Sequence, residues 1–492
     1  MKGTLTPEEI ACGRLCLDTV LREGASDARI TLNKSQMDLV ATLDGKIDRI
    51  SHCLDRSLSL ALFVEGRYGT FSTNRLDPQS LTGFARKAVE TARVLAPDSC
   101  RHLPPRERIE KGAVTGQELE LCDSLYEDIT PESRIRAALD ASLCHPRGEE
   151  DSSLYLETPD PFDRSQTAPS PDPGKENLLP SASPAPGNQI PLPEGVQLLS
   201  EEGEYSDSVF DTIVIDSRGA CCRHTETSFE YGVEVTVADR EGNKYSSYWW
   251  DAAPFLKDLD HLSCPAKALE RACAQIGPRA LESARCNIVI DSEVASKLVT
   301  PILNALAGSA IQQHNSFLDG TMGQKVFSEG LTITDDCRTP GLTGGRLFDS
   351  EGVSTKAHTV IRNGVVEEYF LNTYMSEKTG MPPTSEDITR ARVEGWPRRG
   401  LRREDLMQMC GDGVLITGFN GGNFNAATGE FSYGIEGFAF KDGAISHPIR
   451  EMLLTGDMKT LWNNLIAVGE DARPCTSRSI PSLAFSKADL SA

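Results

Sequence analysis

The chain has 492 residues, of which 39% are apolar and 25% charged, and its formal net charge is −22 at pH 7. At roughly 100 to 200 residues per domain this length predicts two to four domains, and the acidic balance argues against a nucleic-acid partner. No run approaches the 18 or so apolar residues of a membrane helix, no secretory signal opens the chain, and the 14 cysteines are scattered, so we expect a cytoplasmic protein with reduced thiols and no membrane partner.

The first hundred residues alternate between helix and antiparallel-strand signals. Thr6-Pro7-Glu8-Glu9 fits a capping box with proline at the first helical position, so a helix starts there, and Gly24 is a plausible end. Asp44-Gly45 is a strong signal for a two-residue hairpin turn. The expected elements are a helix over 6–24, strands over 37–43, 46–51, 57–64 and 68–72, and a helix over 77–95.

The middle of the chain changes character. A helix is predicted from Thr130 to Leu143, with Thr130 as its N-cap. Eleven prolines then stand between residues 144 and 204, where few apolar groups are available to offset the entropy of ordering the chain. We interpret this stretch as a long surface insertion or linker.

Strand signals dominate again from Tyr205 onward. Asn363-Gly364 marks another hairpin with high specificity. The remaining expected elements are strands over 212–216, 229–238, 244–250, 288–291, 331–334, 359–362, 365–370, 414–419 and 438–441, and helices over 265–275, 292–306 and 457–466.

These elements predict an α+β fold class. An N-terminal α/β domain with antiparallel strands and flanking helices precedes a C-terminal β-rich mixed domain. The predicted ranges are 1–143 for the N-terminal domain, 144–204 for the Pro-rich insertion, 205–290 for a central region of β-hairpin and helix, and 291–492 for the C-terminal domain.

A search for catalytic chemistry finds no complete motif. The chain has eight histidines, and no two of them lie within seven residues of each other, so no zinc-binding His pair can form on one helix turn. His224 precedes Glu226 by two residues and follows Cys221-Cys222, which leaves open a metal site or an ordinary strand with buried thiols. Nucleophile elbows and phosphate-binding glycine loops are absent, so we predict neither catalytic nor metal-binding residues in this chain.

Two glycine-rich stretches carry the candidate binding residues. Glycine permits positive φ and close backbone approach, so these stretches fit a platform that pairs with an extended peptide or a partner chain. From the spacing alone, a set of tight turns between strands is the favoured interpretation. The candidates are Asn420, Gly421, Gly422, Asn423, Thr428 and Gly429.

Taken in order, several sequence blocks resemble the TldD/PmbA family, in particular its PmbA (TldE) branch. The resemblance covers nearly the whole chain except the Pro-rich stretch, and no single block is diagnostic. The blocks include Asn315-Ser316-Phe317-Leu318, Gly323-Gln324-Lys325-Val326, Phe348-Asp349-Ser350-Glu351-Gly352-Val353, Asn372-Thr373-Tyr374, Thr428-Gly429-Glu430-Phe431-Ser432 and Ala467-Val468-Gly469-Glu470-Asp471.

This resemblance implies a two-subunit zinc metallopeptidase. In that family the TldD-type subunit carries a His-Glu-x-x-x-His helix that binds zinc, with a further Cys ligand in the C-terminal part. The corresponding segment here runs from Leu298 to Gly308 and contains neither His nor Glu. The resemblance therefore implies that this chain binds no cofactor and that zinc sits on a TldD-type partner. The degenerate positions are Thr300, Pro301, Asn304 and Ala305.

The expected function is that of a non-catalytic subunit in a cytosolic TldD/TldE-type peptidase acting on unfolded peptides or small proteins. An independent homodimeric hydrolase and a regulatory peptide-binding protein remain open. The family has also been named as a modulator of DNA gyrase. The acidic charge argues against direct DNA contact as the mechanism of such an effect.

Overall fold

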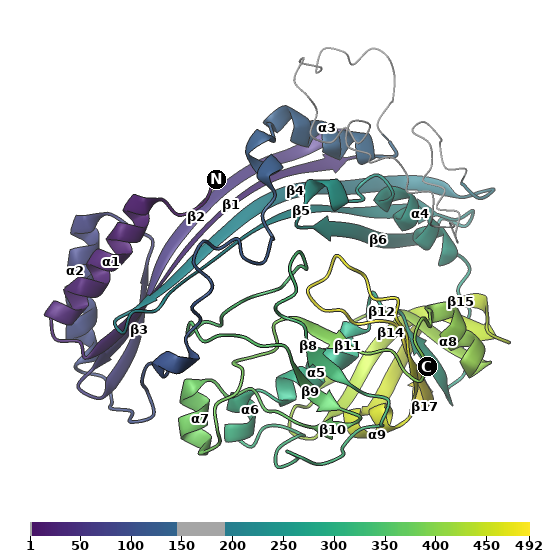
Figure 1. The fold of residues 1–492 in the computed structure, drawn as a ribbon. Helices are drawn as coiled ribbons and strands as arrows, with labels where there is room; N and C mark the ends of the chain where they lie inside the picture. Colours follow the sequence, from purple (N-terminus) through teal and green to yellow (C-terminus); the bar gives the residue numbers. More distant parts are fainter. Residues whose placement is uncertain (1, 145–191) are drawn as a thin grey trace, which may run out of the picture.

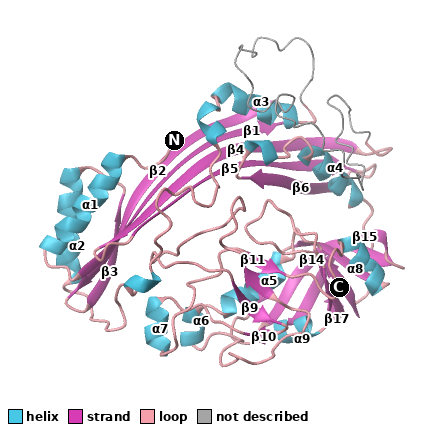
Figure 2. Ribbon diagram, in the orientation of Figure 1, coloured by secondary structure: helices cyan, strands magenta, loops and turns pink. Residues whose placement is uncertain are grey.

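Two bodies make up the structure, a computed structural model that describes residues 2–144 and 192–492. A long curved sheet arches over a second body formed mainly by the C-terminal 210 residues (Figure 1). Helices and strands are mixed throughout, as Figure 2 shows, so the predicted α+β class is confirmed. Most of the predicted Pro-rich stretch, residues 145–191, lies outside the described residues.

The arch is a six-stranded antiparallel sheet in the order β3-β2-β1-β4-β5-β6. Three strands precede residues 145–191 and three follow them, and β1 and β4 pair side by side from Arg29↔Asp216 to Leu43↔Glu202. Asp44 and Gly45 have φ of 49° and 75° at the β1–β2 turn, which confirms the predicted hairpin. The strands are β1 (Asp27–Leu43), β2 (Lys46–Val64), β3 (Arg67–Thr73), β4 (Gln197–Asp216), β5 (Cys221–Ala238) and β6 (Lys244–Ala253).

Strand β4 is much longer than the strand predicted over 212–216. Its buried face, which the helices cover, begins with Glu201, Gly203, Tyr205 and Asp207 and also carries Asp211. Polar residues on this face hide the two-residue apolar alternation by which a strand is recognised in sequence. The strand is nevertheless held, because the Ser142 hydroxyl donates to Glu201 at 2.7 Å and Arg134 pairs with Asp207 at 2.7 Å.

Four helices cover the outer face of the arch (Figure 1). The predicted capping box at the first helix is confirmed, because the Glu9 amide donates to the Thr6 hydroxyl at 3.2 Å and the Thr6 amide donates to the Glu9 carboxylate at 2.9 Å. One apolar cluster joins α1 and α2 to β1–β3, and another joins α3 and α4 to β4–β6. The helices are α1 (Pro7–Arg22), α2 (Pro78–Ala92), α3 (Pro131–Ala141) and α4 (Cys264–Ala274).

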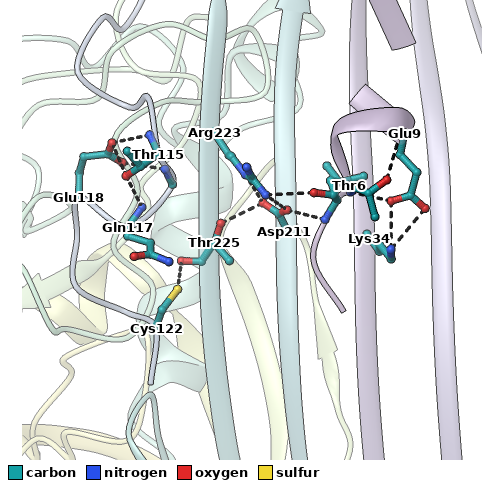
Figure 3. Close-up of polar contacts among 12 residues, drawn as sticks. Thr6, Glu9, Lys34, Thr115, Gln117, Glu118, Cys122, Asp211, Arg223 and Thr225 are labelled. Carbon is teal, nitrogen blue, oxygen red and sulfur yellow. Dashed lines mark hydrogen bonds and ion pairs between the residues drawn. The ribbon is translucent and has the colours of Figure 1, made fainter. Parts of the chain in front are cut away.

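A polar strip crosses the middle of the arch (Figure 3). The fully buried Asp211 carboxylate accepts from the Thr225 hydroxyl at 2.9 Å, from Arg223 at 2.6 Å and from the Leu5 amide at 2.8 Å. Burying a carboxylate is costly unless it is paired and hydrogen-bonded, and here two contacts come from β5 and one from the N-terminal segment. The strip therefore ties β4, β5 and the N-terminal segment together.

The second body is built on two smaller sheets. In the larger sheet, β12 pairs with both β7 and β14, so the path β12-β7-β17-β15-β14 returns to its start. The smaller sheet has the order β10-β9-β8-β11. The strands are β7 (Ala284–Ile290), β8 (Ile333–Asp335), β9 (His358–Arg362), β10 (Val365–Val366), β11 (Ala391–Val393), β12 (Gly413–Phe419), β13 (Asn423–Phe424), β14 (Glu430–Lys441), β15 (Ala444–Asp457), β16 (Leu465–Val468) and β17 (Leu483–Ser491).

Helices in this body are short and pack on a large apolar core. The predicted Asn363-Gly364 hairpin is present, but β10 ends at Val366 rather than at residue 370. The chain leaves the sheet there because Phe370 exchanges backbone hydrogen bonds with Leu306 and Gly308, each at 2.8 Å. The helices are α5 (Ser296–Ala305), α6 (Gly308–Gln312), α7 (Thr373–Thr379), α8 (Arg403–Cys410) and α9 (Met458–Asn463). Within the described ranges, no helix combines the length and the apolar character needed to cross a membrane.

Candidate functional site

A groove runs between the β5–β6 side of the arch and the C-terminal body. Three adjoining cavities of about 840, 460 and 370 Å³ form it. Trp250 and Glu293 line both the first and the second cavity, and Ser228 and Glu230 line both the second and the third. The shared lining residues make the three cavities one continuous feature.

One wall of the groove is the edge strand β6. Side-chain donors occupy two of its outward backbone carbonyls: Gln275 donates to the Ser246 carbonyl at 2.9 Å, and Arg473 donates to the Trp250 carbonyl. Exposed strand edges are ready templates for pairing with another chain. These two donors therefore restrict backbone pairing at β6, while Tyr248 between them is 55% exposed.

Arg473 contacts several side chains of this wall at once. Its guanidinium lies 4.5 Å from the Trp249 ring centre and 5.0 Å from that of Trp250, and it pairs with Glu293 at 2.9 Å and with Asp251 at 3.5 Å. Burial raises the pKa of the Glu293 carboxyl above its ordinary value, although Arg473 acts in the opposite direction. The groove is thus lined by aromatic faces and by a partly desolvated ion pair.

The opposite wall begins where α5 starts. The Asp291 carboxylate forms an ion pair with the Arg403 guanidinium at 2.7 Å, and the Asp291 backbone carbonyl accepts a hydrogen bond from the Ala295 amide at 2.9 Å. These two contacts orient the segment that leads into α5. The apolar face of the helix is fully buried in the core through Leu298, Val299 and Ile302. Helix α5 therefore occupies the place that the sequence predicted for an apolar packing helix, as a shorter element than the predicted 292–306.

Helix α5 carries the four positions at which the family resemblance implies a lost metal motif: Thr300, Pro301, Asn304 and Ala305. Pro301 and Ala305 are buried, Asn304 is exposed, and the Thr300 hydroxyl accepts from Arg478 at 2.5 Å. Protein zinc sites use imidazole, thiolate or carboxylate donors, and a guanidinium against the helix would repel a cation. These residues do not fit a zinc site. Across residues 2–144 and 192–492, no group of three or more His, Cys, Asp or Glu side chains is placed to hold a metal ion.

Cysteine thiolates can also bind a metal ion, and three cysteines are candidates for such ligands. Cys475 lines the second cavity together with Arg478, and burial raises the pKa of its thiol to about 11, so it stays protonated. Cys221 and Cys222 are consecutive in β5 and point to opposite faces, so they do not converge on His224. The His224 ring instead lies 3.1 Å from the Glu226 carboxylate.

The glycine-rich candidates fall in two turns of the C-terminal sheet. Asn420 donates through its side-chain amide to Glu436 at 3.1 Å, and Glu436 lines the first cavity. Gly421 and Gly422 follow with φ of 72° and 119°, and Asn423 pairs with Ser432 in β13. Asn420 is therefore connected to the lining of the first cavity through Glu436, but none of these four residues itself lines a cavity of the groove.

The second turn lies elsewhere. The Thr428 hydroxyl donates to Glu430 at 3.1 Å, and the Gly429 amide and carbonyl are bonded to Asn425 and Met458. A side chain at Gly429 would meet the Phe317 ring at 3.1 Å. None of the cavities of the groove is lined by Thr428 or Gly429.

No sequence motif marks the residues that organise the groove. Arg473, Arg478 and Glu293 belong to polar segments without a motif, and their partners lie 178 to 223 residues away in the chain. Trp249-Trp250, a possible core or interface anchor by sequence, was the only available signal for this wall.

Comparison with known proteins places the chain among metallopeptidase relatives. The profile described as the PmbA/TldA metallopeptidase C-terminal domain matches residues 283–492, and the profile of the corresponding central domain matches residues 180–276. Metalloprotease PmbA of Escherichia coli O157:H7 is 24% identical over 92% of this chain and 89% of its own length. A PmbA homologue from Haemophilus influenzae is 22% identical over 96% and 94%.

Solved structures show the same fold. A Bacteroides thetaiotaomicron protein described as a proposed modulator of DNA gyrase is 31% identical, covers 99% of both chains and has a TM-score of 0.84. TldE of Thermococcus kodakarensis has a TM-score of 0.74 over 98% of this chain and all of its own, at 16% identity.

Proposed function

The chain belongs to the PmbA/TldD metallopeptidase family, and on that premise we propose that it is the non-catalytic subunit of a cytosolic two-subunit zinc peptidase. Its partner would be a TldD-type subunit that carries the zinc ion. The substrates would be unfolded peptides or small proteins. No nucleic-acid contact is part of this proposal, because the net charge is −22.

The observation that carries the proposal is the chemistry of α5. A peptidase that activates water on zinc needs ligands for the metal and a general base beside it. Thr300, Pro301 and Ala305 have the spacing of the first His, the Glu and the second His of the family motif, yet they carry a hydroxyl, a ring and a methyl group. The 2.5 Å contact from Arg478 to Thr300 further supports a structural role for this helix.

In the complex, the groove would receive the peptide chain that the partner cleaves. Trp250 and Tyr248 offer aromatic surface on one wall, and Glu436, which accepts a hydrogen bond from Asn420, also lines the first cavity. Because Gln275 and Arg473 occupy two carbonyls of β6, we expect side-chain contacts with aromatic groups to contribute more to peptide binding here than backbone pairing.

The test uses the full chain alone and co-expressed with a TldD-type subunit from the same genome. Zinc per chain is measured by elemental mass spectrometry, and turnover is measured with a permanently unfolded polypeptide. The chain alone should hold no stoichiometric zinc and show no cleavage, and the pair should show both. Cleavage by the chain alone, if it survives chelation and disappears on one Cys or Asp substitution, would instead establish an independent hydrolase.

A groove variant tests the role of this chain in the pair. Tyr248→Ala should raise KM for the unfolded polypeptide about tenfold while leaving the zinc content unchanged, because an aromatic contact surface is lost. Val94→Ala is the matched control, since Val94 is 81% exposed and does not line the groove. Equal kinetics for the two variants would count against a peptide-binding groove.

A further inference from the structure

The N-terminal half of β2 is an open strand edge. Strand β3 pairs with β2 only from Leu58 to Val64, so among the described residues the part of β2 before Leu58 has a strand neighbour on one side only. In Figure 1, β2 follows the outer margin of the arch. Both faces of this stretch are also open, because every residue from Lys46 to Arg56 except Ser51 is exposed.

Apolar side chains stand on this open stretch. Ile50 is 58% exposed and Leu54 is 55% exposed, although Val40, directly opposite Ile50 in β1, is only 2% exposed. These two side chains lie on the outer face, because directly opposed residues point to the same face and Val40 packs against α3. Isolated exposed apolar residues need no explanation, but two on one face of an unpaired strand edge indicate a contact surface.

The charges on this edge are arranged for self-pairing. Charged residues ordinarily protect a strand edge from other chains. A second copy related by a two-fold axis at His52, perpendicular to the sheet, would place Arg49 opposite Asp55 and Ile50 opposite Leu54. Within one chain Arg49 lies 3.3 Å from Glu204, an exposed ion pair that Arg49 would exchange for Asp55 of the second copy. Because such an interface is isologous, each pair occurs twice. Opposite-charge and apolar cross-strand pairs are the combinations that stabilise antiparallel strands.

Neighbouring registers lack this complementarity. Facing side chains must point to the same face, so the axis can move only by whole residues. With the axis at Ser51, Arg49 would oppose Cys53 and Ile50 would oppose His52. With the axis at Cys53, Ser51 would oppose Asp55 and His52 would oppose Leu54. Only the axis at His52 pairs unlike charges and apolar groups together.

Local structure sets the length of this segment. Asp48 has no partner in β1, since Ala41 pairs with Arg49 and Thr42 with Ile47, and this irregularity ends the regular edge at Arg49. At the other end, Arg56 pairs with Glu9 at 3.1 Å, which also binds Lys34 (Figure 3). Seven regular residues, 49 to 55, remain available, centred on His52.

We propose that residues 49–55 of β2 form an antiparallel interface with a second copy of this chain, with the two-fold axis at His52, so that the two arches share one continuous sheet. The interface lies on the opposite side of the arch from β6 and the groove. It does not depend on a zinc-bearing partner. Asp38, whose carboxylate lies 2.8 Å from the His52 ring, supplies a negative charge beside each of the two facing imidazoles.

Disulfide trapping tests the register. In a full-length background with the exposed Cys53 and Cys221 changed to Ser, His52→Cys places a thiol opposite its own symmetry mate. Facing residues of antiparallel strands have Cα atoms about 4.5–5.5 Å apart, within disulfide range. Mild oxidation should convert most of this variant into a covalent dimer of twice the chain mass. Ile50→Cys is the matched control, because its symmetry mate would lie four residues, roughly 13 Å, away along the strand.

Charge exchange tests the same register without cysteine. Arg49→Asp and Asp55→Arg should each weaken the dimer at least about tenfold in sedimentation velocity, because each places like charges opposite each other twice. The double variant should return to within about threefold of the parent dissociation constant. The proposal is overturned if the full chain is monomeric at about 50 µM, if Ile50→Cys crosslinks as well as His52→Cys, or if the double variant is weaker than both single variants.

Discussion

The two long edges of the arch differ in the contacts that the rest of the chain makes with them. At β6, the side chains of Gln275 and Arg473 occupy backbone carbonyls, and the C-terminal body faces the strand. At β2, residues 49–55 keep an unpaired edge with both faces exposed. One sheet thus carries a protected edge that lines a groove and an open edge directed away from it. The contrast indicates that edge protection is local, supplied by side chains from distant segments rather than by the strand itself.

The largest effect is expected at the protected edge. Arg473→Ala removes the partner of two mostly buried carboxylates, Glu293 and Asp251, which would remain without a compensating charge. Breaking such a pair costs about 3 kcal/mol of unfolding free energy. Urea denaturation measures this loss of unfolding free energy. Arg399→Ala is the control, because the Arg399 side chain is 87% exposed and lies 4.0 Å from Glu470. Equal losses in the two variants would mean that Arg473 does not hold the edge.

A smaller loss is expected when the other donor is removed. Gln275→Ala deletes the hydrogen bond to the Ser246 carbonyl and the one received from Arg450 at 2.7 Å. The net cost should be about 1–2 kcal/mol. Gln324→Ala is a matched control, because its amide also donates to a backbone carbonyl at 2.9 Å, that of Gly320, but in an exposed local turn. Both variants are compared by thermal unfolding. A larger loss of stability for Gln324→Ala than for Gln275→Ala would contradict the assigned role of Gln275.

The protected edge should also have a pH signature. Burial raises the folded pKa of Glu293 above the unfolded value near 4.5, so the folded state binds more protons between these two values. Stability attributable to Glu293 is therefore fully present below pH 4.5 and is lost as the pH rises through the folded pKa. Glu293→Gln should remove this slope, seen as a flatter profile of unfolding free energy against pH. An unchanged slope would show that the titration of Glu293 is not coupled to folding.

The smallest effect is expected at the open edge. Ile50→Ala should change the stability of the monomer by less than about 0.5 kcal/mol, because the side chain is 58% exposed. Val40→Ala, at the facing buried position under α3, should cost about 2 kcal/mol. Denaturation at nanomolar concentration separates this monomer effect from self-association. A loss above 1 kcal/mol for Ile50→Ala would mean that the edge is covered within one chain.

Local signals predicted much of this structure. The Thr6–Glu9 capping box and the Asp44-Gly45 turn were readable because each depends on residues within a few positions of one another. The absence of metal ligands between Leu298 and Gly308 was equally visible, since ligand chemistry is a property of residue type. The full length of β4 was not visible, because polar residues such as Glu201 and Asp207 are buried on its helix-covered face and are satisfied by Ser142 and Arg134.

By itself, the sequence determined the α+β class, the main turns and the family resemblance, all of which rest on short-range patterns and residue chemistry. Only the tertiary structure decided that strands on either side of residues 145–191 share one sheet, and that Arg473 closes one edge of it while β2 remains open at the other. The physical reason is that hydrogen-bond and ion-pair partners more than a hundred residues apart carry no local signature. Folding alone brings Arg478 to Thr300 and leaves Ile50 exposed.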